Sequence, residues 1–259
     1  MIKLGMPQLF EYENIEDNFK LAKKLELDFI EFNLNFASCR EGLENGLIEK
    51  SSNQYHIHVT LHFFDEADFG LYEEVTSAYL SLLMQYAYLG KDFVKQINVH
   101  LNPGPVVTIS GVKHYVYEKE YEQYKSRLVA GLRIAKRLCD KNGHINLVIE
   151  NTDNLPDQSF VKKIYPHLLK EGLRFCYDIG HDHLCNDMIW KLEEQFHLPF
   201  NEFHVHDAKD RKTCHLALGQ GELDIAKFKK LAEKNNAYVV IEVKQESDLI
   251  DSVPLFRKL

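Results

Sequence analysis

Residues 203–222 read FHVHDAKDRKTCHLALGQGE, a stretch that combines a strand, a turn and several possible metal ligands. Its first residues alternate between apolar and polar, which predicts a strand with His204 and His206 on one face. A charged turn follows, and His215 then precedes a pair of glycines and a predicted helix. Because imidazoles and carboxylates are costly to bury alone, a divalent cation is the simplest partner for this group.

Composition is typical of a globular protein, and the chain has the length of one α/β barrel. It has 259 residues, 45% of them hydrophobic and 27% charged, and we expect a single domain over residues 1–259. The net charge of −8 argues against a strongly basic nucleic-acid surface, although it leaves room for a local basic groove. The five cysteines show no CxxC pair, so we expect reduced thiols and a cytoplasmic location. We also expect no signal peptide and no membrane span.

Short apolar runs alternate with amphipathic stretches along the whole chain, which is the pattern of repeated βα units around a parallel sheet. Eight such runs are enough to close a barrel, so the predicted fold class is α/β, a (β/α)8 barrel. The predicted strands are Lys3–Gln8, Phe29–Asn33, His56–His62, Gln96–His100, Ile145–Asn151, Arg174–Asp178, Glu202–His206 and Tyr238–Val243.

Helices are predicted between most of these strands, and two units are weak. Residues 38–53 lack a clean apolar stripe, and the tail Ser247–Leu259 carries Pro254, so the last helix is expected to be stunted. The clear helices are Ile15–Leu25, Leu71–Tyr88, Glu118–Lys141, Ser159–Lys170, Asp187–Phe196 and Leu223–Lys234.

The predicted strands end in residues that can bind a divalent metal. In a barrel of this kind the functional residues lie at the carboxyl ends of the strands. Any one of them alone is more often a solvated or capping group, but the repetition from strand to strand is a stronger signal. The residues are His62, His100, Glu150, Asp178, His204 and Glu242, spaced 26 to 50 residues apart.

Several longer motifs resemble those of the xylose-isomerase-like TIM-barrel superfamily. This superfamily includes sugar (phosphate) isomerases and epimerases and endonuclease IV-like apurinic endonucleases. The resemblance covers nearly the whole chain and implies a TIM barrel with a divalent-metal site. The motifs are IEN at Ile149–Asn151, YDIGHDH at Tyr177–His183, HVHDAKD at His204–Asp210, HLALGQGELD at His215–Asp224 and IEVK at Ile241–Lys244.

The epimerase branch implies one metal, bound by Glu150, Asp178, His204 and Glu242. The two glutamates would exchange protons with a sugar or sugar phosphate through a metal-stabilised enediolate. His181, the third catalytic candidate, matches a histidine that either contacts the substrate or lies behind the metal ligands. Carboxylate and imidazole ligands suit Mn²⁺, Zn²⁺, Mg²⁺ or Co²⁺. No organic cofactor is expected. This isomerase or epimerase activity is our first hypothesis.

The endonuclease branch implies further metals and a phosphodiesterase that acts on abasic DNA. His62, His100 and Glu150 match one zinc site of that branch, and the four epimerase-type ligands match a second. Against this hypothesis, the segment FFDEADFG after the third strand is acidic, where a DNA-binding protein would carry lysine or arginine.

A third zinc in that branch would be bound by His181 and His215 together with an aspartate. The aspartate position is Thr213 here, a poor metal ligand. Asp207 or Asp210 could replace it, and the sequence leaves that choice open.

Remaining residues near the site are candidates for substrate contact. These are His62, His100, Lys244 and His206, of which Lys244 could bind an oxyanion and His206 could instead orient a ligand. The expected partner is a small carbohydrate, and nucleic acid is not favoured. We expect no association with a membrane, and a homodimer is the commonest oligomeric state. A barrel that binds a metabolite without turnover ranks last among the hypotheses.

Overall fold

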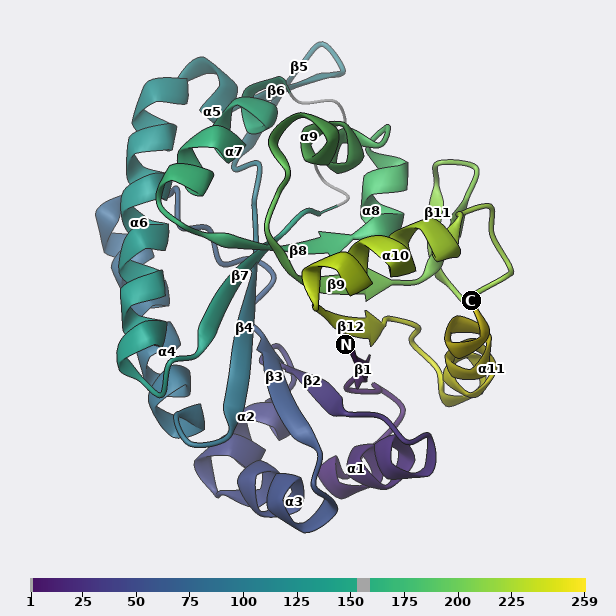
Figure 1. The fold of residues 1–259 in the computed structure, drawn as a ribbon. Helices are drawn as coiled ribbons and strands as arrows, with labels where there is room; N and C mark the ends of the chain where they lie inside the picture. The colour runs from purple at the N-terminus through teal and green to yellow at the C-terminus, as the bar shows by residue number, and fades with distance from the viewer. Residues whose placement is uncertain (1, 153–158) are drawn as a thin grey trace.

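Eight parallel strands close into a barrel, which confirms the predicted (β/α)8 architecture. The computed structural model describes residues 2–152 and 159–259, and Figure 1 shows the strands at the centre with helices around them. Neighbouring strands follow the order β1-β12-β9-β8-β7-β4-β3-β2, and β1 closes the barrel by pairing with both β12 and β2. The barrel strands are β1 (Lys3–Pro7), β2 (Phe29–Asn33), β3 (His58–His62), β4 (Val94–His100), β7 (Asn146–Glu150), β8 (Arg174–Asp178), β9 (Phe200–Val205) and β12 (Tyr238–Ile241).

The helices cover the outside of the barrel through their apolar faces. Tyr177 of β8, for example, packs edge-on against Phe228 of the helix that follows β9, with ring centroids 5.6 Å apart. The helices are α1 (Ile15–Lys24), α2 (Ala37–Glu44), α3 (Leu47–Tyr55), α4 (Glu73–Gly90), α5 (Val116–Lys119), α6 (Tyr121–Lys141), α7 (Ser159–Lys170), α8 (Ile179–Leu184), α9 (Met188–Phe196), α10 (Ile225–Asn235) and α11 (Glu246–Lys258). In the described part of the chain, no helix is long and apolar enough to cross a membrane.

Several element boundaries differ from the prediction. Strand β3 begins at His58, because His56 has a left-handed backbone (φ 56°) and ends α3. The weak second unit contains two complete helices, α2 and α3. The last helix is not stunted: α11 runs for 13 residues with Pro254 inside it, held by buried side chains such as Val253 and Phe256.

Two antiparallel hairpins were not predicted. One is formed by β5 (Val106–Ile109) and β6 (Val112–Tyr115), and the other by β10 (Asp207–Lys209) and β11 (Thr213–Leu216). The second hairpin folds the quoted stretch back on itself and brings the ring centroids of His206 and His215 to 4.1 Å from each other.

The register of the barrel determines which strand ends meet. His100 of β4 is paired with Glu150 of β7, and Asp178 of β8 is paired with His204 of β9. Paired residues of parallel strands point to the same side of a sheet. The register therefore gathers side chains separated by 26 to 50 residues in the chain at one end of the barrel.

Candidate metal centre

Two glutamates converge on one imidazole at the mouth of the barrel. Glu150, at the end of β7, and Glu242, just after β12, each place a carboxylate oxygen 3.3 Å from Nδ1 of His204. All three side chains are buried, with exposed fractions of 1%, 8% and 0%. Three donors, two from β7 and β9 and one from the residue that follows β12, therefore lie around one point inside the protein.

Asp178 is held rigidly beside this group. Its backbone N–H donates to Oδ1 of Asn151, and Nδ2 of Asn151 donates back to its backbone carbonyl. The Asp178 carboxylate also caps α8, because Oδ1 accepts a hydrogen bond from the backbone N–H of His181 at 2.7 Å. These contacts fix the carboxylate before any ligand arrives.

Two further histidines lie on the other side of Glu150. Nε2 of His62 and Nε2 of His100 are 3.3 and 3.7 Å from Oε2 of Glu150, and their rings meet edge-on. The same carboxylate oxygen accepts a hydrogen bond from Asn98 of β4. Glu150 is thus the shared member of two adjacent groups of donors.

The third group contains three imidazoles. His181, His206 and His215 each place a ring nitrogen within 4.8 Å of the others. Nε2 of His206 is 3.1 Å from Oδ1 of Asp178, and its Nδ1 accepts a hydrogen bond from the backbone N–H of His215. His206, which we expected to touch substrate or to orient a ligand, is completely buried, so its contacts fit the orienting role and not substrate contact.

Neither aspartate replaces the missing carboxylate at Thr213. The Asp207 side chain accepts hydrogen bonds from the backbone N–H groups of Ala208, Gly219 and Leu223. Its carboxylate therefore stabilises the hairpin, and Asp210 lies in the exposed turn. The third imidazole grouped with His181 and His215 is His206, and the Asp178 carboxylate lies 3.3 Å from Nδ1 of His181.

Charges in the centre depend on one another. Burial opposes ionisation of Glu150, but the imidazoles of His204 and His100 hold its pKa well below the usual value. Burial likewise opposes ionisation of Glu242, and Lys244 and His204 hold its pKa well below the usual value. Both glutamates are therefore carboxylates at neutral pH.

The histidines divide into two kinds. Burial lowers the pKa of His62, but Glu150 outweighs it and raises the value to about 10. Burial similarly opposes a raised pKa of His181, which Asp178 brings to about 10. Burial dominates at His215 and lowers its pKa to about 4. A proton on His62 or His181 thus supplies positive charge that balances the neighbouring carboxylates.

A divalent cation fits this donor set. Both ring nitrogens of His204 and Oε2 of Glu242 are buried and have no hydrogen-bond partner among the described residues. Unpaired buried polar atoms are costly, and carboxylate and imidazole groups are the donors that Mn²⁺, Zn²⁺ and similar ions accept. Glu150, Asp178, His204 and Glu242 would hold the ion.

A small cavity of about 80 Å³ opens beside the donors. Nζ of Lys244 lies in its wall, 2.7 Å from Oε1 of Glu242, and the rings of Phe10 and Phe36 lie at its rim with centroids 5.9 Å apart. Of the four residues expected to contact substrate, His62 and Lys244 line the cavity, whereas His100 and His206 do not. The complete lining is Pro7, Gln8, Phe10, Glu31, Asn33, Phe36, His62, Glu242 and Lys244.

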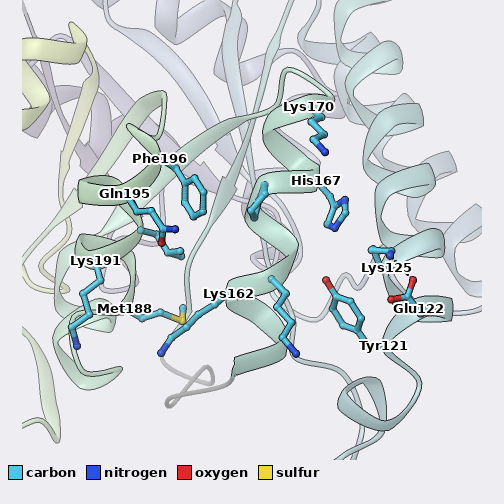
Figure 2. Close-up of a pocket in the computed structure, with 13 residues that line it drawn as sticks. Tyr121, Glu122, Lys125, Lys162, His167, Lys170, Met188, Lys191, Gln195 and Phe196 are labelled. Atoms are coloured by element: carbon cyan, nitrogen blue, oxygen red, sulfur yellow. Dashed lines mark hydrogen bonds and ion pairs between the residues drawn. The ribbon is translucent and has the colours of Figure 1, made fainter.

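A much larger groove of about 650 Å³ lies on the outer side of the barrel, between α6, α7 and α9. Figure 2 shows its lysines, together with Tyr121 and Phe196. None of the strand-end donors lines it. It is therefore separate from the candidate metal centre.

A layer of polar residues that was not predicted from the sequence lies below the centre. Glu31 of β2 places Oε2 3.2 Å from Nε2 of His204, and Gln96 donates from Nε2 to Oε2 of Glu202 at 2.7 Å. All of them are buried. Strand alternation was the available signal, because Glu202 lies two residues before His204 and on the same face.

The family is shown by comparison with known proteins. Residues 19–259 match the model of the family described as xylose isomerase-like TIM barrel, and the chain belongs to that family. A curated relative, the uncharacterized protein MJ1614 of Methanocaldococcus jannaschii, is 24% identical over 174 residues. The match spans 63% of this chain and 64% of that protein.

Solved structures share the fold at low sequence identity. The 3-keto-D-glucoside 4-epimerase YcjR from E. coli superposes with a TM-score of 0.75 at 16% identity, over 100% of both chains. Endonuclease IV from Thermus thermophilus superposes with a TM-score of 0.63 at 16% identity, over 99% of this chain and 98% of that one. Both branches of the superfamily are thus represented among the structural neighbours.

Proposed function

We propose that the protein is a divalent-metal-dependent isomerase or epimerase that acts on a sugar or sugar phosphate. The observation that carries this proposal is the position of Glu150 and Glu242, which approach the same nitrogen of His204 from different strands. Two buried carboxylates around one cation can exchange protons with a substrate bound between them. The epimerase among the structural neighbours adds support from the fold alone.

The proton path follows from the charges. One of the carboxylates, Glu150 or Glu242, removes the proton from the carbon next to the substrate carbonyl, and the other returns a proton from the opposite face. Because both glutamates are ionised in the free protein, the one that returns a proton must first take it up from solvent, while the ammonium group of Lys244, 2.7 Å from Glu242, holds that carboxylate in place. When bound, the cation would draw electron density from the substrate oxygens and stabilise the enediolate.

The remaining residues position the substrate. His181 is 12% exposed in its side chain and lies beside Asp178 and Glu150, where it can donate a hydrogen bond to a hydroxyl group. Lys244 also provides a positive charge in the wall of the cavity, which suits an oxyanion or phosphate. The rings of Phe10 and Phe36 would cover an apolar face of the sugar.

The second candidate is an endonuclease IV-like zinc phosphodiesterase. The observation in its favour is the placement of His62 and His100 against Glu150, since one-metal epimerisation does not need these additional donors. Against it stand Thr213 and the commitment of Asp207 to backbone hydrogen bonds. The epimerase proposal accounts for the buried glutamate pair more directly.

Exchange of a substrate proton with solvent tests the proposal. The Mn²⁺-loaded protein is incubated with a panel of ketoses and ketose phosphates in D₂O, and deuterium at the carbon next to the carbonyl is followed by NMR. We expect incorporation into at least one sugar, and none with the Glu150→Gln variant. The exposed Glu233 gives a matched control, Glu233→Gln, which should retain exchange. Absence of exchange across the panel, together with cleavage of an abasic oligonucleotide, would favour the phosphodiesterase instead.

A further inference from the structure

Below the candidate metal centre, the barrel interior contains two buried acidic side chains, and their partners among the described residues include no lysine or arginine. Glu31 of β2 and Glu202 of β9 have exposed fractions of 3% and 0%. Their nearest partner that can carry a positive charge is Nε2 of His204, which lies 3.2 Å from Oε2 of Glu31.

Unpartnered oxygen atoms occur on these two glutamates and on residues paired with or bonded to them. Oε1 of Glu31 and Oε1 of Glu202 have no hydrogen-bond partner among the described residues. The same is true of Oε1 of Gln96 and Oγ1 of Thr60, although both residues are completely buried. Gln96 is in contact with Glu202, and Thr60 is the register partner of Glu31.

Such a cluster is energetically unfavourable unless a proton or a cation binds to it. Each unsatisfied buried polar atom costs about 1–3 kcal/mol, and a charged one costs more. All four of these atoms are oxygens that can bind a cation, and without an added proton only the hydroxyl group of Thr60 can donate a hydrogen bond. Oxygen-rich clusters of this kind are the environment that Mg²⁺ or Mn²⁺ prefers.

We propose that the barrel interior holds a second divalent cation, bound by Glu31 and Glu202, with Gln96 and Thr60 as neutral oxygen donors. A ring nitrogen of His204 and one oxygen of each glutamate lie within 4.8 Å of one another, a spacing that one ion can bridge. His204 would then have one ring nitrogen toward each cation, as an imidazolate that has released its remaining ring proton to solvent, because its Nδ1 faces Glu150 and Glu242 and its Nε2 faces Glu31. The inner cation fixes the orientation of this imidazole.

Metal counting in two backgrounds tests the proposal. Wild type, Glu202→Gln, Asp178→Asn and the double variant are stripped with a chelator, reloaded with Mn²⁺, freed of excess metal and analysed by mass spectrometry. Glu202→Gln should lower the count by one ion per chain both in wild type and in the Asp178→Asn background. Glu193→Gln is the matched control, because Glu193 is also buried with an unpartnered oxygen but lies on α9, and its count should equal that of wild type.

Two results would overturn the proposal. An unchanged count in Glu202→Gln would mean that the two acids share a proton and bind no ion. A loss that disappears in the Asp178→Asn background would mean that Glu202 only supports the ion at the mouth. Failure of the proposed catalytic function would be distinguished by absent deuterium exchange at an unchanged metal count.

A charge-conserving variant protects the test against a folding defect. Glu202→Asp keeps the carboxylate but withdraws it by one methylene group. We expect the midpoint of the second Mn²⁺ binding step to rise at least about tenfold, which corresponds to about 1.4 kcal/mol. Identical binding curves for Glu202→Asp and wild type would contradict the inner site.

Discussion

The mouth of the barrel and the groove on its outer side differ in how their charges are held. At the mouth, Glu150, Asp178 and Glu242 are buried, and each is close to at least one imidazole. In the groove, lysines such as Lys163 and Lys170 extend from α7, and Lys163 lies over the ring of Tyr121. The mouth cavity is about 80 Å³ and the groove about 650 Å³.

The comparison favours buried charge over cavity size as the criterion for the functional site. Lysines on a solvated helix face cost little to place there, because water screens their charge. Buried carboxylates are costly, so their presence requires a compensating ion or proton. We therefore assign the chemistry to the small cavity and not to the large groove, and the following variants test that assignment.

The largest effect is expected for Glu150→Gln. This change removes a proton acceptor and a metal ligand without changing the shape of the side chain, so turnover should fall by about a thousandfold, within the range of general acid–base catalysis. The assay is epimerisation of the substrate found by deuterium exchange. A loss of less than about tenfold, with Glu233→Gln as control, would show that Glu150 is not a proton acceptor.

A smaller effect is expected for Lys244→Met. The lost charge-assisted hydrogen bond to Glu242 should lower kcat/KM by about 10- to 100-fold. Because Lys244 holds the pKa of Glu242 down, its removal should also shift the acidic limb of the pH profile to higher pH. Lys170→Met on the outer groove is the matched control. An unshifted profile would argue against the contact between Lys244 and Glu242 in solution.

The metal-free protein should lose stability on the alkaline side. The pKa of His62 is raised to about 10, so its contribution is complete below pH 6.5, the usual value, and is lost as pH rises toward 10. Each 1 kcal/mol lost lowers Tm by about 2–4 °C in a chain of this size. Thermal unfolding followed by circular dichroism at pH 6 and pH 9.5 measures the difference.

Metal loading provides the control for this pH effect. A bound cation replaces the proton as the positive charge, so Tm of the loaded protein should change less between the two pH values. A metal-free protein that is equally stable at pH 6 and pH 9.5 would contradict the coupling between His62 and Glu150.

The smallest effect is expected in the outer groove. Lys163→Ala and Lys170→Ala remove solvated charges, so turnover should stay within about twofold and the free energy of unfolding within about 0.5 kcal/mol. The epimerisation assay and chemical denaturation measure both quantities. A tenfold loss of turnover in either variant would show that the groove takes part in the reaction.

Much of the fold and the outer ring of donors was predictable from the sequence. The βα alternation predicts the barrel, and strand-end position predicts the convergence of Glu150, Asp178 and His204, because both depend on local periodicity. The β10–β11 hairpin was not predicted, since its turn needs left-handed backbones at Asp210 and Arg211 (φ 57° and 47°), and arginine is not among the residue types enriched in that conformation.

The inner layer was missed for a different reason. Glu31 lies in the middle of the apolar run FIEFN, where a charged residue is usually interpreted as facing solvent. Only the closed barrel turns that face inward. The role of Asp207, which the sequence alone left open, depends instead on the fold of residues 208–223, whose backbone N–H groups bind its carboxylate.

Anomalous diffraction from crystals soaked in Mn²⁺ tests the central claim most directly. We predict a strong peak at the mouth of the barrel, about 2.0–2.3 Å from donor atoms of Glu150, Asp178, His204 and Glu242. Well-ordered side chains at this position without an anomalous peak, or a Mn²⁺ ion bound only elsewhere on the protein, would contradict the account.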